Sequence, residues 1–274
     1  TEREFTELAL VAEDAGWDQV FTWEAVWGQD AWVTLGAAVM ATERIRLGTL
    51  RTPAARHRPW DLASRVASLD RLSGGRVTLG VGLGALHGNW LAFEADEGRA
   101  VRARKLDEVL DVYAGLMGGQ PFSYTGEHFS ASPVTELVPP PPVQTPHPPV
   151  WCVGLMVHSR SRQRSLERAA RWQGVFPAMT GGSLENPGSQ LTPPALRELV
   201  ERLGALRAEA GQTMQGYDVV VEGDSHGDFG TARPPVRQWA DAGATWWVES
   251  WWDLPDSPEG RAETRPRLAL GPRR

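Results

Sequence analysis

The sequence predicts an α/β fold in which parallel strands alternate with helices around one large core. Segments of strand character follow amphipathic helical segments through most of the chain, an order typical of parallel β/α units. The chain has 274 residues, of which 41% are apolar and 23% are charged, which is enough to build one domain of barrel size. We therefore expect a single domain over residues 1–274.

The first hundred residues have well-marked helix ends. Apolar side chains from Phe5 to Ala15 share one helical face, and Gly16 ends that helix. A second stop, at 73–75, follows a helix with apolar residues at 62, 66, 69 and 72. The pattern predicts strands at 19–23, 45–50 and 76–84, a helix at about 30–41, and a longer helix at about 100–117 whose apolar residues keep a 3.6-residue period.

The segment at about 119–149 has a different character and is expected to be an insertion. Residues 122–131 resemble a short hairpin, and 133–149 contain too many prolines for a helix or an inner strand. We interpret the proline-rich part as a strap over the domain. A linker between two domains is the alternative, which the return of a strand at 150–154 without any change in composition disfavours.

The remaining chain predicts further β/α units. Strands are expected at 150–154, 174–177, 217–222 and 244–249, with helices near 159–171, 193–210 and 233–242. Thr192, followed by two prolines, suits a helix start. The total is seven strands, and the chain opens on a helix that would normally follow a strand. An eight-stranded barrel that apparently lacks its first strand is therefore expected.

Composition excludes several classes of partner. The net charge is −6 with scattered basic residues, which disfavours binding to nucleic acid or to an anionic membrane surface. Cys152 is the only cysteine, so an internal disulfide and a cysteine-based zinc site are excluded. The sequence has no run of eighteen apolar residues and no export signal. We expect a cytoplasmic protein without a metal whose partner is a small molecule, with a homodimer left open.

Six segments, spread over nearly the whole chain, resemble the luciferase-like monooxygenases and their deazaflavin-dependent relatives. They are AEDAGWDQVFTWE (12–24), ATERIRLGTLRTP (41–53), RPWDLASRVASLDRLSGGRVTLGVGLG (58–84), RARKLDEVLDVYAGLMGGQPFSYTGEHF (102–129), PPPVQTPHPPVWCVG (140–154) and GATWWVES (243–250). The resemblance implies a TIM-type (β/α)8 barrel, luciferase-like, and FMN or coenzyme F420 as the cofactor. It does not choose between the two cofactors.

In such a barrel the carboxyl ends of the strands carry the chemistry. The resemblance implies that the cofactor ring lies across these ends, with a cis peptide or bulge at Thr49-Leu50 supporting one ring face, and that the phosphate binds the turn at 154–161. Gly82 and Gly84 would admit the ring, although they could simply relieve crowding. The candidate cofactor-binding residues are Trp23, Thr49, Leu50, Gly82, Gly84, Asn89, Gly154, His158, Ser159 and Arg160.

Two departures from the family pattern bear on activity. Leu155 follows Gly154 where a second glycine is usual, and Ala25 follows Glu24 where many relatives have Trp-Asp-His. Glu24 is the candidate catalytic acid or base, and a structural carboxylate at the strand end is the alternative. His57, His87 and His158 also lie near expected strand ends.

The chain is rich in tryptophan, which favours an apolar substrate pocket. Trp246 and Trp247 should point to opposite sides of their strand, so at least one of them belongs to the core. The candidate pocket residues are Trp27, His87, Trp90, Trp247 and Glu249.

These observations favour a flavin- or deazaflavin-dependent oxidoreductase that acts on a small organic substrate by monooxygenation or hydride transfer. The sequence has no GxSxG, HExxH or Walker motif, in agreement with chemistry supplied by a cofactor. Two alternatives remain open. One is a non-catalytic or degenerate flavin-binding protein of the same fold. The other, a cofactor-free hydrolase that uses Glu24, Glu222 and Glu249, is disfavoured because the strand at 76–84 ends in glycines rather than in a carboxylate.

Overall fold

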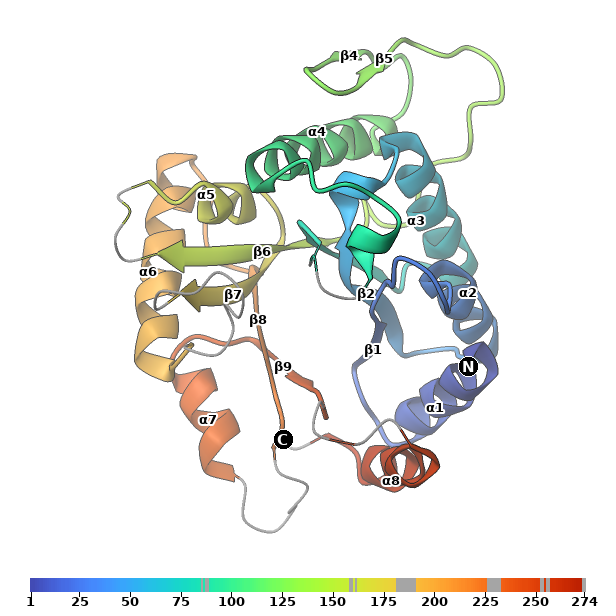
Figure 1. The fold of residues 1–274 in the computed structure, drawn as a ribbon, viewed down its shortest axis with the longest axis vertical. Coiled ribbons are helices and arrows are strands. Elements are labelled where there is room, and N and C mark those ends of the chain that lie inside the picture. Colours follow the sequence, from blue (N-terminus) through green and yellow to red (C-terminus); the bar gives the residue numbers. More distant parts are fainter. Residues whose placement is uncertain are drawn as a thin grey trace. The chain divides into compact units, whose positions relative to one another are not determined.

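The computed structural model describes residues 1–84, 86, 89–157, 160, 162–180, 191–225, 233–251, 254 and 257–272. The chain forms two compact units, Thr1–Pro149 and Val150–Arg274 (Figure 1). Each unit is described by itself.

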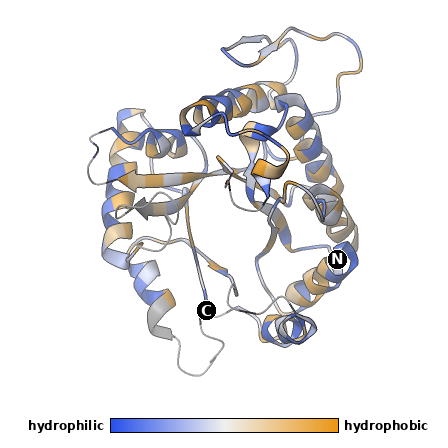
Figure 2. Ribbon diagram, in the orientation of Figure 1, coloured by the Kyte–Doolittle hydropathy of each residue, from blue (hydrophilic) through white to orange (hydrophobic). Residues whose placement is uncertain are grey.

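Unit 1 alternates helices with parallel strands in the predicted order. Its elements are α1 (Glu2–Asp14), β1 (Gln19–Thr22), α2 (Ala31–Ala41), β2 (Arg46–Pro53), η1 (Ala54–Arg56), α3 (Pro59–Ser73), β3 (Val77–Gly82), η2 (Trp90–Ala92), α4 (Arg99–Met117) and a hairpin of β4 (Tyr124–Thr125) and β5 (Ser130–Ala131). Apolar and hydrophilic residues alternate around α3 and α4, as expected of helices with one buried face (Figure 2).

Local capping interactions explain where α2 begins and where α3 ends. The Asp30 carboxylate accepts hydrogen bonds from the backbone N–H groups of Trp32 (2.8 Å) and Val33 (2.9 Å), which starts α2. Gly74 has φ +66°, in the left-handed region, and ends α3 at the predicted stop. These local signals explain why the sequence predicted both helices closely.

The three long strands of unit 1 are parallel and neighbour one another in the order β1-β2-β3. Thr22 pairs with Thr49, and Pro53 pairs with Gly82. Because all three strands run the same way, their carboxyl ends lie at one edge of the sheet. The residues that follow these ends form the candidate site.

Two half-buried side chains organise the junction between α2 and β2. The Glu13 carboxylate accepts hydrogen bonds from the backbone N–H groups of Glu43, Arg44 and Ile45 at 2.6–3.2 Å. The Arg76 guanidinium donates to the carbonyls of residues 39, 42, 45 and 73. Glu13 and Arg76 thus provide hydrogen-bond partners for backbone groups around the start of β2, which would otherwise be removed from water without a partner.

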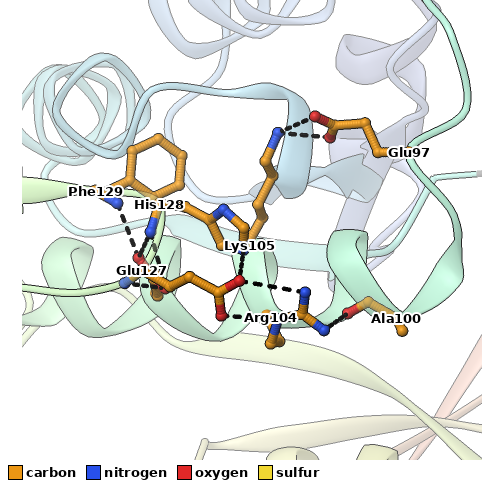
Figure 3. A network of polar contacts seen from close by, with 8 residues as sticks. Glu97, Ala100, Arg104, Lys105, Glu127, His128 and Phe129 are labelled. Carbon is orange, nitrogen blue, oxygen red and sulfur yellow. Dashed lines mark hydrogen bonds and ion pairs between the residues drawn. The ribbon is translucent and has the colours of Figure 1, made fainter.

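The predicted hairpin at 122–131 is present and is fixed to α4. β4 and β5 pair antiparallel, and the buried Glu108 carboxylate accepts the N–H groups of Glu127, His128 and Phe129 in the turn. Arg104 and Glu127 add an exposed ion pair of 3.0 Å beside it (Figure 3).

The strap is attached at its far end as well. The buried Asp70 carboxylate accepts the N–H groups of Val143 and Gln144, and Gln144 donates from its side chain to Asp70 at 2.7 Å. No helix or strand is formed between β5 and Val150, as the prolines predicted.

Unit 2 contains four parallel strands in the order β6-β7-β8-β9. Its elements are β6 (Val150–Val157), α5 (Arg164–Ala170), β7 (Gly174–Thr180), α6 (Pro193–Glu209), β8 (Asp218–Gly223), α7 (Arg233–Asp241), β9 (Trp246–Glu249) and α8 (Pro258–Ala269). In the part of the chain that the structure describes, no helix is both long and apolar enough to cross a membrane.

In unit 2 the structure corrects the ends of β6 and β7 and the start of α5, and it adds the helix α8. β6 continues to Val157 rather than ending at 154, because its last residues pair with Ala178 to Thr180 of β7. α5 begins at Arg164, later than expected, because Gln163 closes a turn before it. The sequence analysis did not anticipate α8, since Pro266 lies inside it.

Candidate active site

The candidate site in unit 1 is formed by residues that follow three neighbouring strands. Trp23 and Glu24 follow β1, His57 follows β2 and η1, and Gly84 follows β3. Parallel pairing places these segments at one edge, as the sequence predicted for the strand ends.

Glu24 is paired with a histidine from a different segment. Its Oε1 lies 2.7 Å from Nε2 of His57, and both side chains are only 12% exposed. The second carboxylate oxygen, Oε2, is buried and has no hydrogen-bond partner among the residues that the structure describes. A buried carboxylate oxygen without a donor is energetically costly, so this atom is suited to receive a proton or a hydrogen bond from a ligand.

Arg65 of α3 contacts the other side of the His57 ring. Its Nη1 lies 3.4 Å from Nδ1 of His57, and its guanidinium lies over the Trp32 ring at 6.0 Å. Glu24, His57 and Arg65 thus form a row that crosses from the end of β1 to α3.

A cis peptide bond lies in β2, one bond later than expected. It joins Leu50 to Arg51 rather than Thr49 to Leu50, and the β2–β3 register shifts between Thr49 and Thr52. The Thr52 hydroxyl donates to that of Thr49 (2.9 Å), which donates to the Gly80 carbonyl (3.0 Å). Both threonines are buried, and Leu50 is half-buried beside them.

Gly84 is required by a close packing contact. Its φ is +80°, and a Cβ placed there would lie 1.9 Å from Cζ3 of Trp90. The indole of Trp90 therefore occupies the space that opens beside this glycine. Gly82, the last residue of β3, is buried.

Charged groups hold Trp90 in place. Its Nε1 donates to Glu94 (2.7 Å), and the guanidinium groups of Arg56 and Arg102 lie 4.9 and 5.4 Å from its ring centre. Hydrogen bonds from Arg56 hold the pKa of Glu94 below its ordinary value, although partial burial acts in the opposite direction. Asn89, just before this helix, has φ +67° and is exposed.

The tryptophans near β1 are exposed. Trp23 and Trp27 are 59% and 80% accessible, so in this structure neither is enclosed by its neighbours. Trp90, by contrast, is buried.

In unit 2, the candidate phosphate turn differs from its predicted form. Gly154 lies inside β6, where a Cβ would lie 2.5 Å from Cγ2 of Val175 and 2.9 Å from Cδ2 of Leu166, so packing explains this glycine. The turn itself is fixed by Gln163, which donates to the carbonyls of Val157 and Arg160. His87, His158 and Ser159 lie outside the described residues.

At the end of β9, Glu249 has several partners. It accepts hydrogen bonds from Trp247, Trp251 and Ser225, which accounts for both carboxylate oxygens. Trp246 instead donates to Asp218 and contacts Trp151, in agreement with the predicted opposite directions of Trp246 and Trp247.

Sequence reasoning did not identify the partners that fix these candidates. His57 was noted only as lying near a strand end, and Arg65 and Gln163 were not considered. His57 precedes α3 and Arg65 lies within it, so no helix periodicity links the two, and their contact is set by how the segment after η1 folds.

The fold and site together define an α/β protein of parallel strands with a largely buried carboxylate–imidazole pair at the strand ends. The chain belongs to the luciferase-like monooxygenase family, whose model matches residues 1–226. The fold agrees with that family. A monooxygenase of Streptomyces bottropensis superimposes with a TM-score of 0.72 over 98% of this chain and 91% of its own, at 19% identity. The predicted luciferase-like TIM-barrel fold class and the family resemblance are confirmed.

Two curated relatives match part of the chain. An uncharacterized protein of Mycobacterium tuberculosis is 40% identical over 121 residues, which are 44% of this chain and 41% of the relative. An F420-dependent glucose-6-phosphate dehydrogenase of Beutenbergia cavernae is 34% identical over 143 residues, 48% of this chain and 42% of the relative. The matched stretches span less than half the length of these relatives.

Proposed function

We propose that this chain is a redox enzyme that uses coenzyme F420 or FMN to oxidise, reduce or oxygenate a small organic substrate. Membership of the luciferase-like family supports the class of reaction. The relative from Beutenbergia cavernae is F420-dependent by name and supports F420 as the first cofactor to test.

The free oxygen of Glu24 is the observation that most strongly supports catalysis. It is buried at the carboxyl end of β1, with the peptide Leu50–Arg51 and the packed Gly84 on the following strand ends. When bound, the cofactor would supply the two-electron chemistry. Glu24 would hold or release the accompanying proton at Oε2.

The proposed contacts of the cofactor ring lie on unit 1. Trp23, Thr49, Leu50, Gly82, Gly84 and Asn89 remain the proposed ring-binding residues, and the buried Thr49–Thr52 pair fixes the backbone at the centre of that set. Trp27, His87 and Trp90 remain the proposed substrate contacts on this unit.

On unit 2, taken by itself, the turn after β6 remains the proposed phosphate contact. His158, Ser159 and Arg160 are the residues proposed there, beside Gln163, which donates to the Arg160 carbonyl; Gly154, the other predicted contact, lies inside β6. Trp247 and Glu249 remain proposed substrate contacts at the end of β9. We also propose a cytoplasmic location, which agrees with Cys152 being a buried cysteine outside any disulfide.

Titration of the purified protein with oxidised F420 and with FMN, followed by fluorescence, tests cofactor use. The proposal expects saturable binding of one cofactor, and a substrate-dependent change in its absorbance under anaerobic conditions. Three reactions are then tested: alcohols with the oxidised cofactor, aldehydes and enones with the reduced cofactor, and the same substrates with reduced FMN after oxygen is admitted. Binding without a substrate-dependent change in any of them would favour the non-catalytic alternative. Failure to bind either cofactor would contradict the proposal.

A further inference from the structure

We propose that His57 positions the catalytic carboxylate of Glu24, as a neutral imidazole whose protonation site is set by Arg65. The inference rests on the proposed function, since it assigns a role within the same site. In this proposal His57, which follows β2 and η1, donates the hydrogen bond that orients the Glu24 carboxylate. Ala25, the residue after Glu24, has no side-chain group that could do so.

The geometry fixes one carboxylate oxygen and leaves the other free. His57 Nε2 lies 2.7 Å from Oε1 of Glu24, whereas Oε2 is buried without a partner. A carboxylate held at one oxygen has a fixed plane, so the free oxygen points in a constant direction. The enclosure of both side chains strengthens this hydrogen bond relative to one in water.

Arg65 determines which nitrogen of His57 carries the proton. A guanidinium has only donors, so the Arg65 N–H that meets Nδ1 at 3.4 Å requires a lone pair on that nitrogen. The ring proton therefore resides on Nε2 and is donated to Glu24. An imidazolium would place its second N–H against the guanidinium, donor against donor and cation against cation.

This arrangement defines the proton transfer at the site. When a substrate O–H or C–H bond breaks, the proton forms a new O–H bond with Oε2 of Glu24, and the electron pair of the broken bond remains on the substrate. His57 neither gains nor loses a proton, because Nε2 is already protonated and Nδ1 faces Arg65. His57 is thus a positioning residue rather than a relay.

The tautomer can be measured without cofactor. Long-range ¹H–¹⁵N spectra of the full chain report the protonation of each imidazole nitrogen, and the His57→Gln spectrum assigns the signals. We expect a neutral ring with the proton on Nε2. Arg65→Met should produce a mixture of tautomers, whereas Arg58→Met, an exposed arginine close by, should not. A proton on Nδ1, or a doubly protonated ring, would overturn the proposal.

Two replacements of His57 test the positioning role. Glutamine can place an amide donor near the position of Nε2, whereas asparagine is too short to reach Glu24. We expect His57→Gln to keep kcat within a few-fold of the wild type, and His57→Asn to lower kcat by up to ~10²-fold with little change in KM, since misplacement of a reacting group has that order of cost. Both values refer to the folded fraction, measured by circular dichroism.

The outcomes separate the two proposals. Equal kcat values for His57→Gln and His57→Asn would overturn the positioning role while leaving the proposed function intact. A wild-type chain that shows no turnover with either cofactor would overturn the proposed function, and the positioning role of His57 with it.

Discussion

Oε1 of Glu24 lies 2.7 Å from Nε2 of His57, although the first residue follows β1 and the second follows β2 and η1. The pair exists because parallel strands bring their carboxyl ends together, and because the three-residue η1 turns the chain back toward β1. The Glu24–His57 contact at this edge therefore depends on two segments rather than on one sequence motif.

The packing of Gly84 against Trp90 can be tested by one added methyl group. Gly84→Ala places a Cβ 1.9 Å from Trp90 at a residue with φ +80°. We expect a loss of about 2–4 kcal/mol in the free energy of unfolding from overpacking and backbone strain, together with a shift in tryptophan fluorescence.

Gly98→Ala is the matched control. Gly98 has a similar φ of +84°, but a Cβ there would meet no atom within 4 Å. It should show the backbone cost alone, about 1–2 kcal/mol. Equal losses in the two variants would mean that Trp90 does not pack against Gly84 in solution.

Glu13 should make the stability of the protein depend on acid. Burial raises the pKa of its carboxyl, but the three backbone N–H donors and Arg44 outweigh this effect and lower it below its ordinary value of 4.5. Because the folded-state pKa is the lower one, this contribution to stability is complete above about pH 4.5 and is lost as the pH falls through the folded-state value.

We expect Glu13→Gln to lower the free energy of unfolding by about 1.5–3 kcal/mol at pH 7 and to flatten its decline in acid. Urea unfolding between pH 7 and pH 3 measures both effects. Glu7→Gln, an exposed position on the same helix, should change little. Parallel pH profiles for wild type and Glu13→Gln would show that Glu13 is not the group concerned.

The stability of the hairpin should depend more on Glu108 than on the exposed ion pair between Arg104 and Glu127. Glu108→Gln weakens three hydrogen bonds from the turn, at a cost of about 1–3 kcal/mol, and should speed hydrogen exchange at the amides of 127–129. Glu127→Gln removes only the exposed contact with Arg104, a pair that is typically worth less than about 1 kcal/mol. If exchange at 127–129 responds equally to both changes, Glu108 is not the anchor.

The fold could be predicted because its signals are local. Gly16, Asp30 and Gly74 mark helix ends within a few residues, and strands follow at the expected positions. The end of β6 could not be predicted in this way, since its last residues are defined by pairing with β7, far away in the sequence. The sequence did not predict α8, because a proline such as Pro266 normally disfavours the interior of a helix.

The candidate site could be predicted only at the level of single strand ends. Glu24 was identified by its position after a strand, and the resemblance placed a backbone irregularity within one bond of Leu50–Arg51. The partners of Glu24 depend on tertiary geometry. No sequence pattern shows that Nε2 of His57 faces Glu24 while Nδ1 faces Arg65.

We propose that Glu24 exchanges a proton during a cofactor-dependent redox reaction. Glu24→Gln keeps the shape and most hydrogen bonding of the side chain, so cofactor affinity should remain nearly unchanged. Turnover should fall by ~10²–10⁴-fold, and the acidic limb of the pH–rate profile should disappear.

The most direct measurement is the anaerobic rate at which substrate changes the absorbance of the bound cofactor, in the wild type and in Glu24→Gln, at matched cofactor saturation. We expect a rapid change of cofactor absorbance in the wild type and a change at least ~10²-fold slower in Glu24→Gln, with equal cofactor dissociation constants. Equal rates with the same pH dependence would contradict it.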